Sequence, residues 1–158
     1  MGTYDHLFVT RMVECADDLV NEGAAAGEPR PGNISDPFGL MRAADVAQST
    51  VHMAYSWIHP TDEPVHWVNV HEHTYDEVLF WTGNNPDDVH DLGGELYLDI
   101  EGERHVVTTT GAVFIPAGVR HCPLGFQKVT RSFSFCALSL NGSYSSDENV
   151  PTALLTHT

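Results

Sequence analysis

Basic residues are scarce in this chain of 158 residues, which has 7 Lys and Arg against 22 Asp and Glu and a formal net charge of −15. The basic side chains are scattered along the sequence and form no cluster. A chain of this charge is repelled by phosphate backbones and by anionic lipid surfaces. We therefore expect neither nucleic acid nor a membrane as a partner.

Long apolar runs are also missing, since no stretch approaches the roughly eighteen residues that a membrane-spanning helix needs. The first fifteen residues have no basic region followed by an apolar run, so we expect no secretory signal. Cysteine is limited to Cys15, Cys122 and Cys136, an odd set without CxxC spacing. This pattern favours a reducing compartment, and we expect the cytoplasm. The length and the 42% hydrophobic content indicate one folded domain.

The N-terminal part of the chain predicts a helix over residues 3–22. Apolar residues recur there at spacings of three and four, which would place one face against a core: Leu7, Phe8, Met12, Cys15, Ala16 and Leu19. A segment rich in Gly, Ala and Pro follows and reads as a connecting arm. We divide the chain into a helix and arm at 1–48, a β-barrel at 49–140 and a polar tail at 141–158.

Strand patterns dominate from residue 49 onward. In residues 49–58, Val51, Met53, Tyr55 and Trp57 alternate with His52, Ala54, Ser56 and Ile58. Residues 95–100 and 104–109 read as a hairpin whose turn includes Gly102, and 127–140 as one long alternating strand. Many short strands with frequent turns are typical of an all-β sandwich or barrel.

Ten histidines are present, and two of them mark the first candidate site. His71 and His73 are two apart on a predicted strand, so their imidazoles can point to the same side. A short turn can return Glu77 to the same place.

The second candidate segment contains Pro116, Gly118 and His121. A tight Pro-x-Gly turn after a strand can return the chain so that His121 faces the same cavity. Three imidazoles and a carboxylate are a common ligand set for Fe(II), Mn(II), Ni(II), Co(II) or Zn(II).

These two segments resemble the two motifs of the cupin superfamily. In the first, His71, His73 and Glu77 match, Val65 stands at the leading glycine and Gly83 closes the motif one residue early. In the second, Pro116, Gly118 and His121 match, the leading glycine is displaced to Gly111, and Gly125 replaces the closing Asn. The resemblance covers roughly residues 49–140.

The resemblance implies an all-β fold, the double-stranded β-helix or jelly-roll barrel of cupins, here with an N-terminal helix. It also implies a divalent metal held by His71, His73, Glu77 and His121, with Glu77 as the candidate catalytic group. Fe(II) is favoured, with Mn, Ni, Co or Zn as alternatives. Glu77 could instead hydrogen-bond one imidazole without touching the metal. Cupins of this size resemble homodimers, so we expect a homodimer.

The pocket around the metal should be formed by inward-facing strand residues. Trp81 shares a face with Glu77 if the strand is regular, and Arg131 shares a face with Phe133. We expect Trp81, Arg131 and Phe133 to contact the substrate, with Arg131 as a candidate partner for an anionic group. Ordinary barrel packing and a surface ion pair are the alternatives.

The expected function is that of a metal-dependent enzyme acting on a small organic molecule. By family frequency an oxygenase of the dioxygenase type is favoured. A redox-neutral decarboxylase, isomerase or lyase is the first alternative, and a non-catalytic binding or sensing protein is the second. A sugar-modifying cupin without metal is disfavoured, because all four ligand positions are present.

Overall fold

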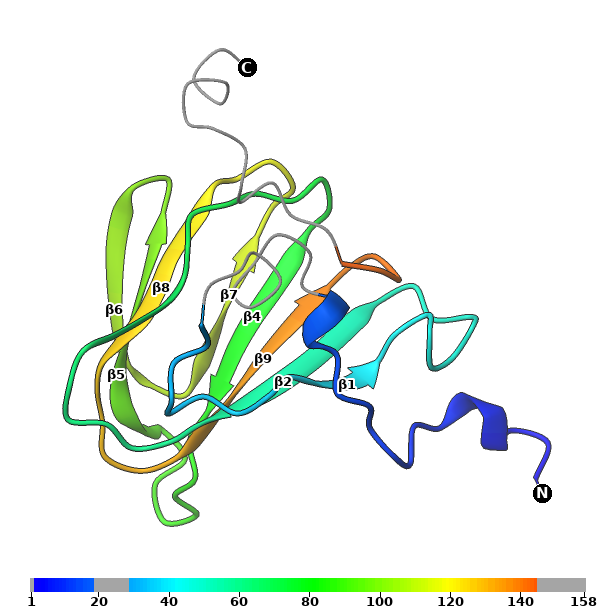
Figure 1. Cartoon of the computed structure of the whole chain (residues 1–158), viewed down its shortest axis with the longest axis horizontal. Helices are drawn as coiled ribbons and strands as arrows, with labels where there is room; N and C mark the ends of the chain where they lie inside the picture. The colour runs from blue at the N-terminus through cyan, green and yellow to red at the C-terminus, as the bar shows by residue number, and fades with distance from the viewer. Residues whose placement is uncertain (1, 19–28, 145–158) are drawn as a thin grey trace.

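The computed structural model describes residues 2–18 and 29–144 (Figure 1). Within these residues nine strands form two antiparallel sheets, and the first sheet has the order β1-β2-β9-β4-β7. Its strands are β1 (Phe38–Met41), β2 (His52–Ile58), β9 (Phe133–Ser139), β4 (Glu77–Thr82) and β7 (Gly111–Ile115). The second sheet has the order β3-β8-β5-β6. Its strands are β3 (Val65–Val68), β8 (His121–Val129), β5 (Asp91–Ile100) and β6 (Glu103–Thr109).

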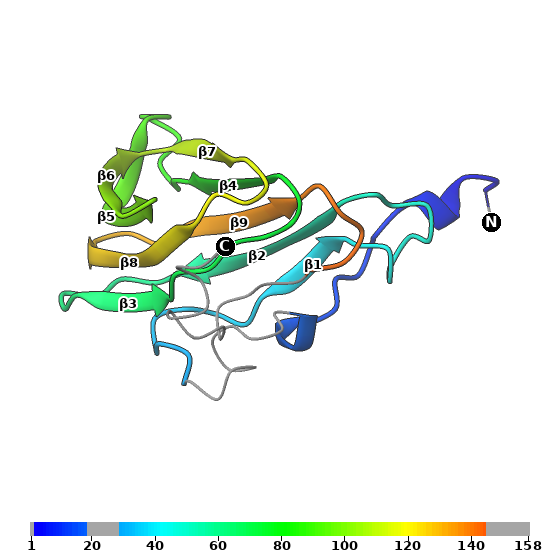
Figure 2. The same cartoon turned by 90° about the horizontal axis from the view of Figure 1, so that it is seen from above.

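The two sheets face each other, as the view from above shows (Figure 2). The alternation in β2 decides which side chains point inward, because His52, Ala54, Ser56 and Ile58 are buried whereas Trp57 is exposed. A continuous apolar core fills the space between the sheets, and among its most deeply buried members are Leu92, Leu96, Leu124, Phe126 and Phe133. The predicted all-β jelly roll is therefore confirmed.

The predicted N-terminal helix is wrong for the part of it that is described. Only two short 3₁₀ turns occur there, η1 (Asp5–Leu7) and η2 (Ala16–Asp18), and residues 19–22 lie outside the described residues. Between the turns the backbone pairs with the edge of β1, where Cys15 N donates to Pro37 O at 2.9 Å. The supposed buried face is largely open, since Phe8 is 69% exposed. Pairing with the sheet edge replaces the hydrogen bonds of a helix.

The sheet also begins earlier in the chain than residue 49, because β1 pairs with β2. The hairpin around Gly102 is present as β5 and β6. The single long strand predicted over 127–140 is instead two strands, β8 and β9. The turn between them is held by Gly93, whose carbonyl oxygen accepts hydrogen bonds from Thr130 N at 2.8 Å and Arg131 N at 3.0 Å. The described residues contain no helix with the length and apolarity that crossing a membrane requires.

Candidate metal centre

Three histidines from two distant segments meet at the inner wall of the barrel. His71 and His73 lie between β3 and β4, and His121 is the first residue of β8. Their ligand nitrogens all lie within 4.8 Å of one another, and all three side chains are buried. Nitrogens bound to one tetrahedral metal ion at about 2.1 Å lie about 3.4 Å apart. The three rings would therefore move closer together by up to about 1.4 Å to share one metal ion.

Backbone pairing brings the two segments together. His71 N donates to His121 O at 3.0 Å, and His121 N donates to His71 O at 2.9 Å. The Pro-x-Gly turn that precedes His121 is fixed in turn, since Gly118 N donates to His73 O at 2.8 Å. Gly118 has φ +80°, a conformation that favours glycine. The spacing of the second motif thus follows from the turn that returns His121 to His71.

The proton positions of two imidazoles follow from their backbone partners. His71 Nδ1 lies 2.8 Å from the carbonyl oxygen of Asn69, and His121 Nδ1 lies 2.9 Å from that of Val119. A carbonyl oxygen only accepts, so the proton is assigned to Nδ1 in both rings. In the neutral rings, the Nε2 lone pairs remain available for a metal.

Glu77 completes the cluster from the start of β4. Its Oε2 lies 3.4 Å from His73 Nε2, and its Oε1 lies 3.4 Å from His121 Nε2. Ser139 on the neighbouring strand donates to Oε2 at 3.3 Å. The carboxylate is only 2% exposed, and burying a charge is costly unless an opposite charge lies close by. Three imidazoles around a buried carboxylate are therefore a donor set suited to a divalent cation.

A cavity of about 100 Å³ adjoins this cluster. Residues of both sheets and Tyr144 line it, and Tyr144 lies just beyond the end of β9. Its hydroxyl lies 3.4 Å from His73 Nε2. Sequence reasoning missed Tyr144, because it lies in a segment that reads as a polar tail and carries no periodic signal.

The three residues expected to contact substrate lie elsewhere. Trp81 is buried in the core, and its Nε1 donates to Thr109 O at 2.9 Å. Phe133 is fully buried against Phe126. Arg131 lies in the turn between β8 and β9 and forms an ion pair with Asp91. The alternation placed Trp81 and Phe133 on the correct face, but at a level of the barrel away from the histidines.

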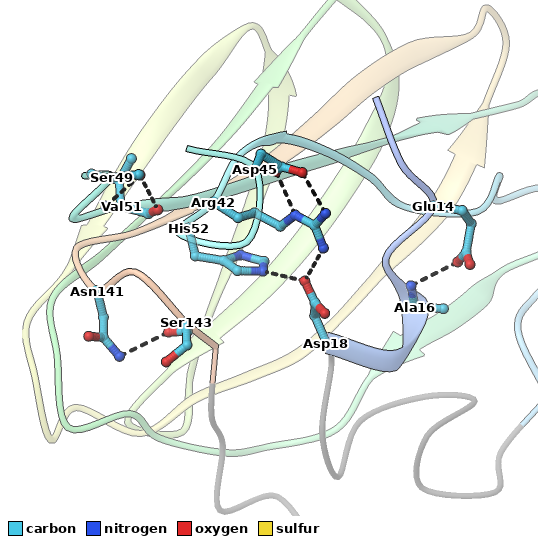
Figure 3. A network of polar contacts seen from close by, with 10 residues as sticks. All are labelled: Glu14, Ala16, Asp18, Arg42, Asp45, Ser49, Val51, His52, Asn141 and Ser143. Carbon is cyan, nitrogen blue, oxygen red and sulfur yellow. Dashed lines mark hydrogen bonds and ion pairs between the residues drawn. The ribbon is translucent and has the colours of Figure 1, made fainter. Parts of the chain in front are cut away.

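A second polar cluster lies beside the site and fixes the N-terminal segment (Figure 3). Arg42 is 7% exposed and forms two hydrogen bonds of 2.7 Å with Asp45 and a third of 2.7 Å with Asp18 of η2. His52 Nε2 lies 3.0 Å from the same Asp18 carboxylate. The His52 ring in turn lies 5.7 Å from the ring of Tyr144. This cluster links η2 to the wall of the cavity.

The pKa values in this cluster follow from its contacts. Burial alone would raise the pKa of Asp18, but hydrogen bonds from Arg42 and His52 outweigh it and hold that pKa below its usual value. Hydrogen bonds from Arg42 lower the pKa of Asp45. The two carboxylates raise the pKa of Arg42. All three groups are therefore charged at neutral pH.

No model of a known protein family matches the sequence, and no curated protein matches it in a sequence comparison. Similar folds occur among solved structures. An oxalate oxidase in complex with the substrate analogue glycolate is 15% identical, with a TM-score of 0.56 over 97% of this chain and 73% of that one. The polyketide cyclase RemF from Streptomyces resistomycificus is 13% identical, with a TM-score of 0.51 over 78% of this chain and 76% of that one. A cupin-2 domain from Rhodospirillum rubrum is 12% identical, with a TM-score of 0.49 over 78% of this chain and 70% of that one.

The first two likenesses show a shared fold and, at identities this low, nothing more. Within this chain, the residues of both cupin motifs lie side by side on the inner wall of a two-sheet jelly roll. The chain therefore has the cupin fold, the double-stranded β-helix of the cupin superfamily.

Proposed function

We propose that this chain is a metal-dependent enzyme acting on a small organic molecule. His71, His73, Glu77 and His121 would hold a divalent transition metal. The observation that carries the proposal is the convergence of three buried imidazoles and a buried carboxylate beside a cavity. The backbone acceptors of His71 and His121 support it, because they turn Nε2 of each ring toward the cluster.

An oxygenase with Fe(II) is the reaction type we favour, and a redox-neutral decarboxylase, isomerase or lyase is the alternative. A bound metal would polarise substrate oxygens and, as Fe(II), would also support oxygen chemistry. The similar folds include an oxalate oxidase and a polyketide cyclase, so this fold carries enzymes of more than one reaction type. The residues of the chain would orient the substrate and exclude water, and Glu77 is the candidate catalytic carboxylate. A non-catalytic ligand-binding role is the second alternative.

Elemental analysis of the purified protein tests this proposal. We expect about one metal ion per chain, and loss of that metal in His121→Ala. His90→Ala is the matched control, because His90 is exposed and is not one of the clustered histidines. Bound iron with oxygen uptake would favour the oxygenase, and bound Mn, Ni or Zn the redox-neutral class. Equal metal content in the wild type, His121→Ala and His90→Ala would contradict the metal site.

We also propose that the protein is a homodimer that pairs through the outer face of the five-stranded sheet. Side chains that alternate with the buried Glu77, Leu79 and Trp81 point outward there. Strand pairing aligns them in two apolar rows that cross all five strands. The rows are Met41, Met53, Leu138, Val78 and Phe114, and Phe38, Tyr55, Cys136, Phe80 and Ala112.

The apolar composition and the lack of charge of this face support a second copy as its partner. Strands about 4.8 Å apart and a two-residue repeat of about 6.8 Å give the two apolar rows a projected area of about 330 Å². The face carries no ionisable carboxylate or amine in either row, so two chains of net charge −15 can approach there without direct charge contact. Phe114 is 56% exposed in the single chain.

The cytoplasm is our proposed location. It is supported by the odd number of cysteines and by their spacing, which favour a reducing compartment. Burial raises the pKa of the Cys15 and Cys136 thiols to about 12, so both remain protonated and apolar. The scarcity of basic residues supports a small-molecule partner over nucleic acid or an anionic membrane.

A further inference from the structure

The cavity beside the histidines has one polar end and an apolar body. His71, Glu77 and His121 form the polar end, with the hydroxyl of Tyr144 beside them. Most of the remaining wall is aliphatic, aromatic or thiol: Pro37, Ala54, Trp67, Val68, Leu79, Cys122, Leu124, Phe135 and Ala137. Trp67 packs edge-on against Phe135, with ring centroids 5.2 Å apart. A ligand that fills this space must itself be largely apolar.

None of the seven basic residues lines this cavity, and all seven lie in the described part of the chain. Five of the six arginines form ion pairs elsewhere: Arg30 with Asp36, Arg42 with Asp18 and Asp45, Arg104 with Asp99, Arg120 with Glu72, and Arg131 with Asp91. Arg11 and Lys128 are exposed. A ligand anion inside the cavity would therefore find no Arg or Lys as its counter-charge.

The charge balance at the polar end limits the ligand further. A divalent cation with ionised Glu77 and three neutral imidazoles leaves one positive charge. That charge can balance one anionic oxygen of a ligand. A dianionic ligand would leave the site with one negative charge in excess beside side chains such as Leu79 and Leu124, where an unbalanced charge is costly.

From these observations we infer the substrate class, an inference that rests on the proposed function. The substrate is a compact molecule with an aryl or short branched alkyl body. It carries one oxygen-bearing head group that is neutral or singly charged, such as a phenol, an enolisable ketone or a monocarboxylate. Small dicarboxylates are excluded, in contrast to the substrate named for the similarly folded oxalate oxidase.

Ligand binding to the zinc-loaded protein tests this inference without any turnover. Tropolone and oxalate both bind metals through two oxygens, but tropolone has one charge and an apolar ring, whereas oxalate has two charges and no apolar body. By isothermal titration calorimetry we expect tropolone to bind at least about 100-fold more tightly than oxalate. Comparable affinities, or tighter oxalate binding, would overturn the inference. Metal content measured after each titration checks that neither ligand has removed the zinc.

A pair of alanine variants tests whether the apolar body of the cavity is responsible. Ala137→Leu on β9 would fill part of the cavity, whereas Ala47→Leu adds the same group in the exposed turn between β1 and β2. We expect Ala137→Leu to weaken tropolone binding at least about tenfold with unchanged metal content, and Ala47→Leu to leave it unchanged. An unaffected Ala137→Leu would contradict the inference.

The metal-free protein separates failure of this inference from failure of the proposed function. Benzyl alcohol carries no chelating group and should still enter the apolar body, so it should change the fluorescence of Trp67. The fluorescence change should disappear in Trp67→Phe, which shows that it comes from Trp67 and not from the two other tryptophans. A protein that binds no metal but shows this response would overturn the proposed function and leave the apolar cavity standing. A protein that binds metal without this response would overturn the inference alone.

Discussion

The hydroxyl of Tyr144 lies 3.4 Å from Nε2 of His73, the nitrogen that faces Glu77. The ring of the same tyrosine lies 5.7 Å from the ring of His52, which contacts Asp18 of the N-terminal segment. Tyr144 thus joins the ligand cluster to the polar cluster around Arg42. It also adds a hydroxyl to a cavity whose wall is mainly apolar.

Tyr144→Phe removes this hydroxyl and retains the ring that packs on His73 and His52. A typical hydrogen bond contributes about 0.5–1.5 kcal/mol, so we expect tropolone to bind about 2- to 10-fold more weakly to the zinc-loaded variant. Metal content and the unfolding midpoint should not change. Loss of metal in this variant would instead assign the hydroxyl to the metal ligands.

Glu77→Gln removes the negative charge of the cluster and keeps the size of the side chain. We expect the affinity for Zn²⁺ to fall at least about tenfold, because a neutral amide is a weaker partner for a cation. Competition with a zinc-binding dye measures the change. Glu103→Gln, on an exposed side chain of β6, serves as the control and should bind zinc like the wild type. Equal affinities of the two variants would remove Glu77 from the metal site.

Acid should weaken the attachment of the N-terminal segment. The folded-state pKa values of Asp18 and Asp45 are lowered, so their contribution to stability is present above the unfolded pKa of about 4 and is lost as the pH falls through the lower folded values. Arg42→Met should be less stable than the wild type at pH 7, and this difference should shrink toward pH 3. Urea unfolding at a series of pH values measures it. A difference independent of pH would contradict the role of these ion pairs.

Gly125 of β8 replaces the closing Asn of the second cupin motif, and the structure leaves no room for a side chain there. A Cβ atom would clash with the backbone oxygen of Val65 and with the phenol of Tyr97. We expect Gly125→Ala to lower the free energy of unfolding by about 2 kcal/mol, a typical cost of overpacking. Gly32→Ala is the control, since no atom lies within 4 Å of its added Cβ, and it should change stability by less than about 0.5 kcal/mol.

A charged substitution at the exposed residue Phe114 tests the proposed interface on the outer face of the five-stranded sheet. Phe114→Glu should convert the proposed dimer into a monomer, because it places a carboxylate in the apolar row of each copy. Light scattering after size-exclusion chromatography measures the mass. Val106→Glu on β6 is the matched control, because Val106 is also 56% exposed but lies on the other sheet. A monomeric wild type, or a dimeric Phe114→Glu, would contradict this interface.

The sequence predicted the fold and the histidine cluster because both depend on short-range spacing. The i, i+2 relation of His71 and His73 and the tight turn at Gly118 are local properties, and the strand pairing then brings His121 to them. The site residues themselves remain predictions until a metal is measured.

The rest depended on contacts between distant segments. Met12 and Cys15 have helical spacing, but the backbone between them pairs with the edge of β1. The alternation of side chains along a strand predicts that Trp81 points inward, but it does not predict how far along the barrel Trp81 lies from the histidines. Arg131 was placed on a strand because no glycine or proline marks the turn between β8 and β9.

The place of β9 in the five-stranded sheet has a consequence for synthesis of the chain. Of the strands in the described residues, β9 is the last to be synthesised, yet it lies between β2 and β4 and pairs with both (Figure 1). A nascent chain that ends before residue 133 can form neither of these pairings, and it also lacks Ser139, which donates to Glu77. Until then, the apolar inner faces of β2 and β4 have no completed sheet around them. The ribosome-bound chain therefore passes through a late, aggregation-prone stage, and the contact of Ser139 with Glu77 forms only after it.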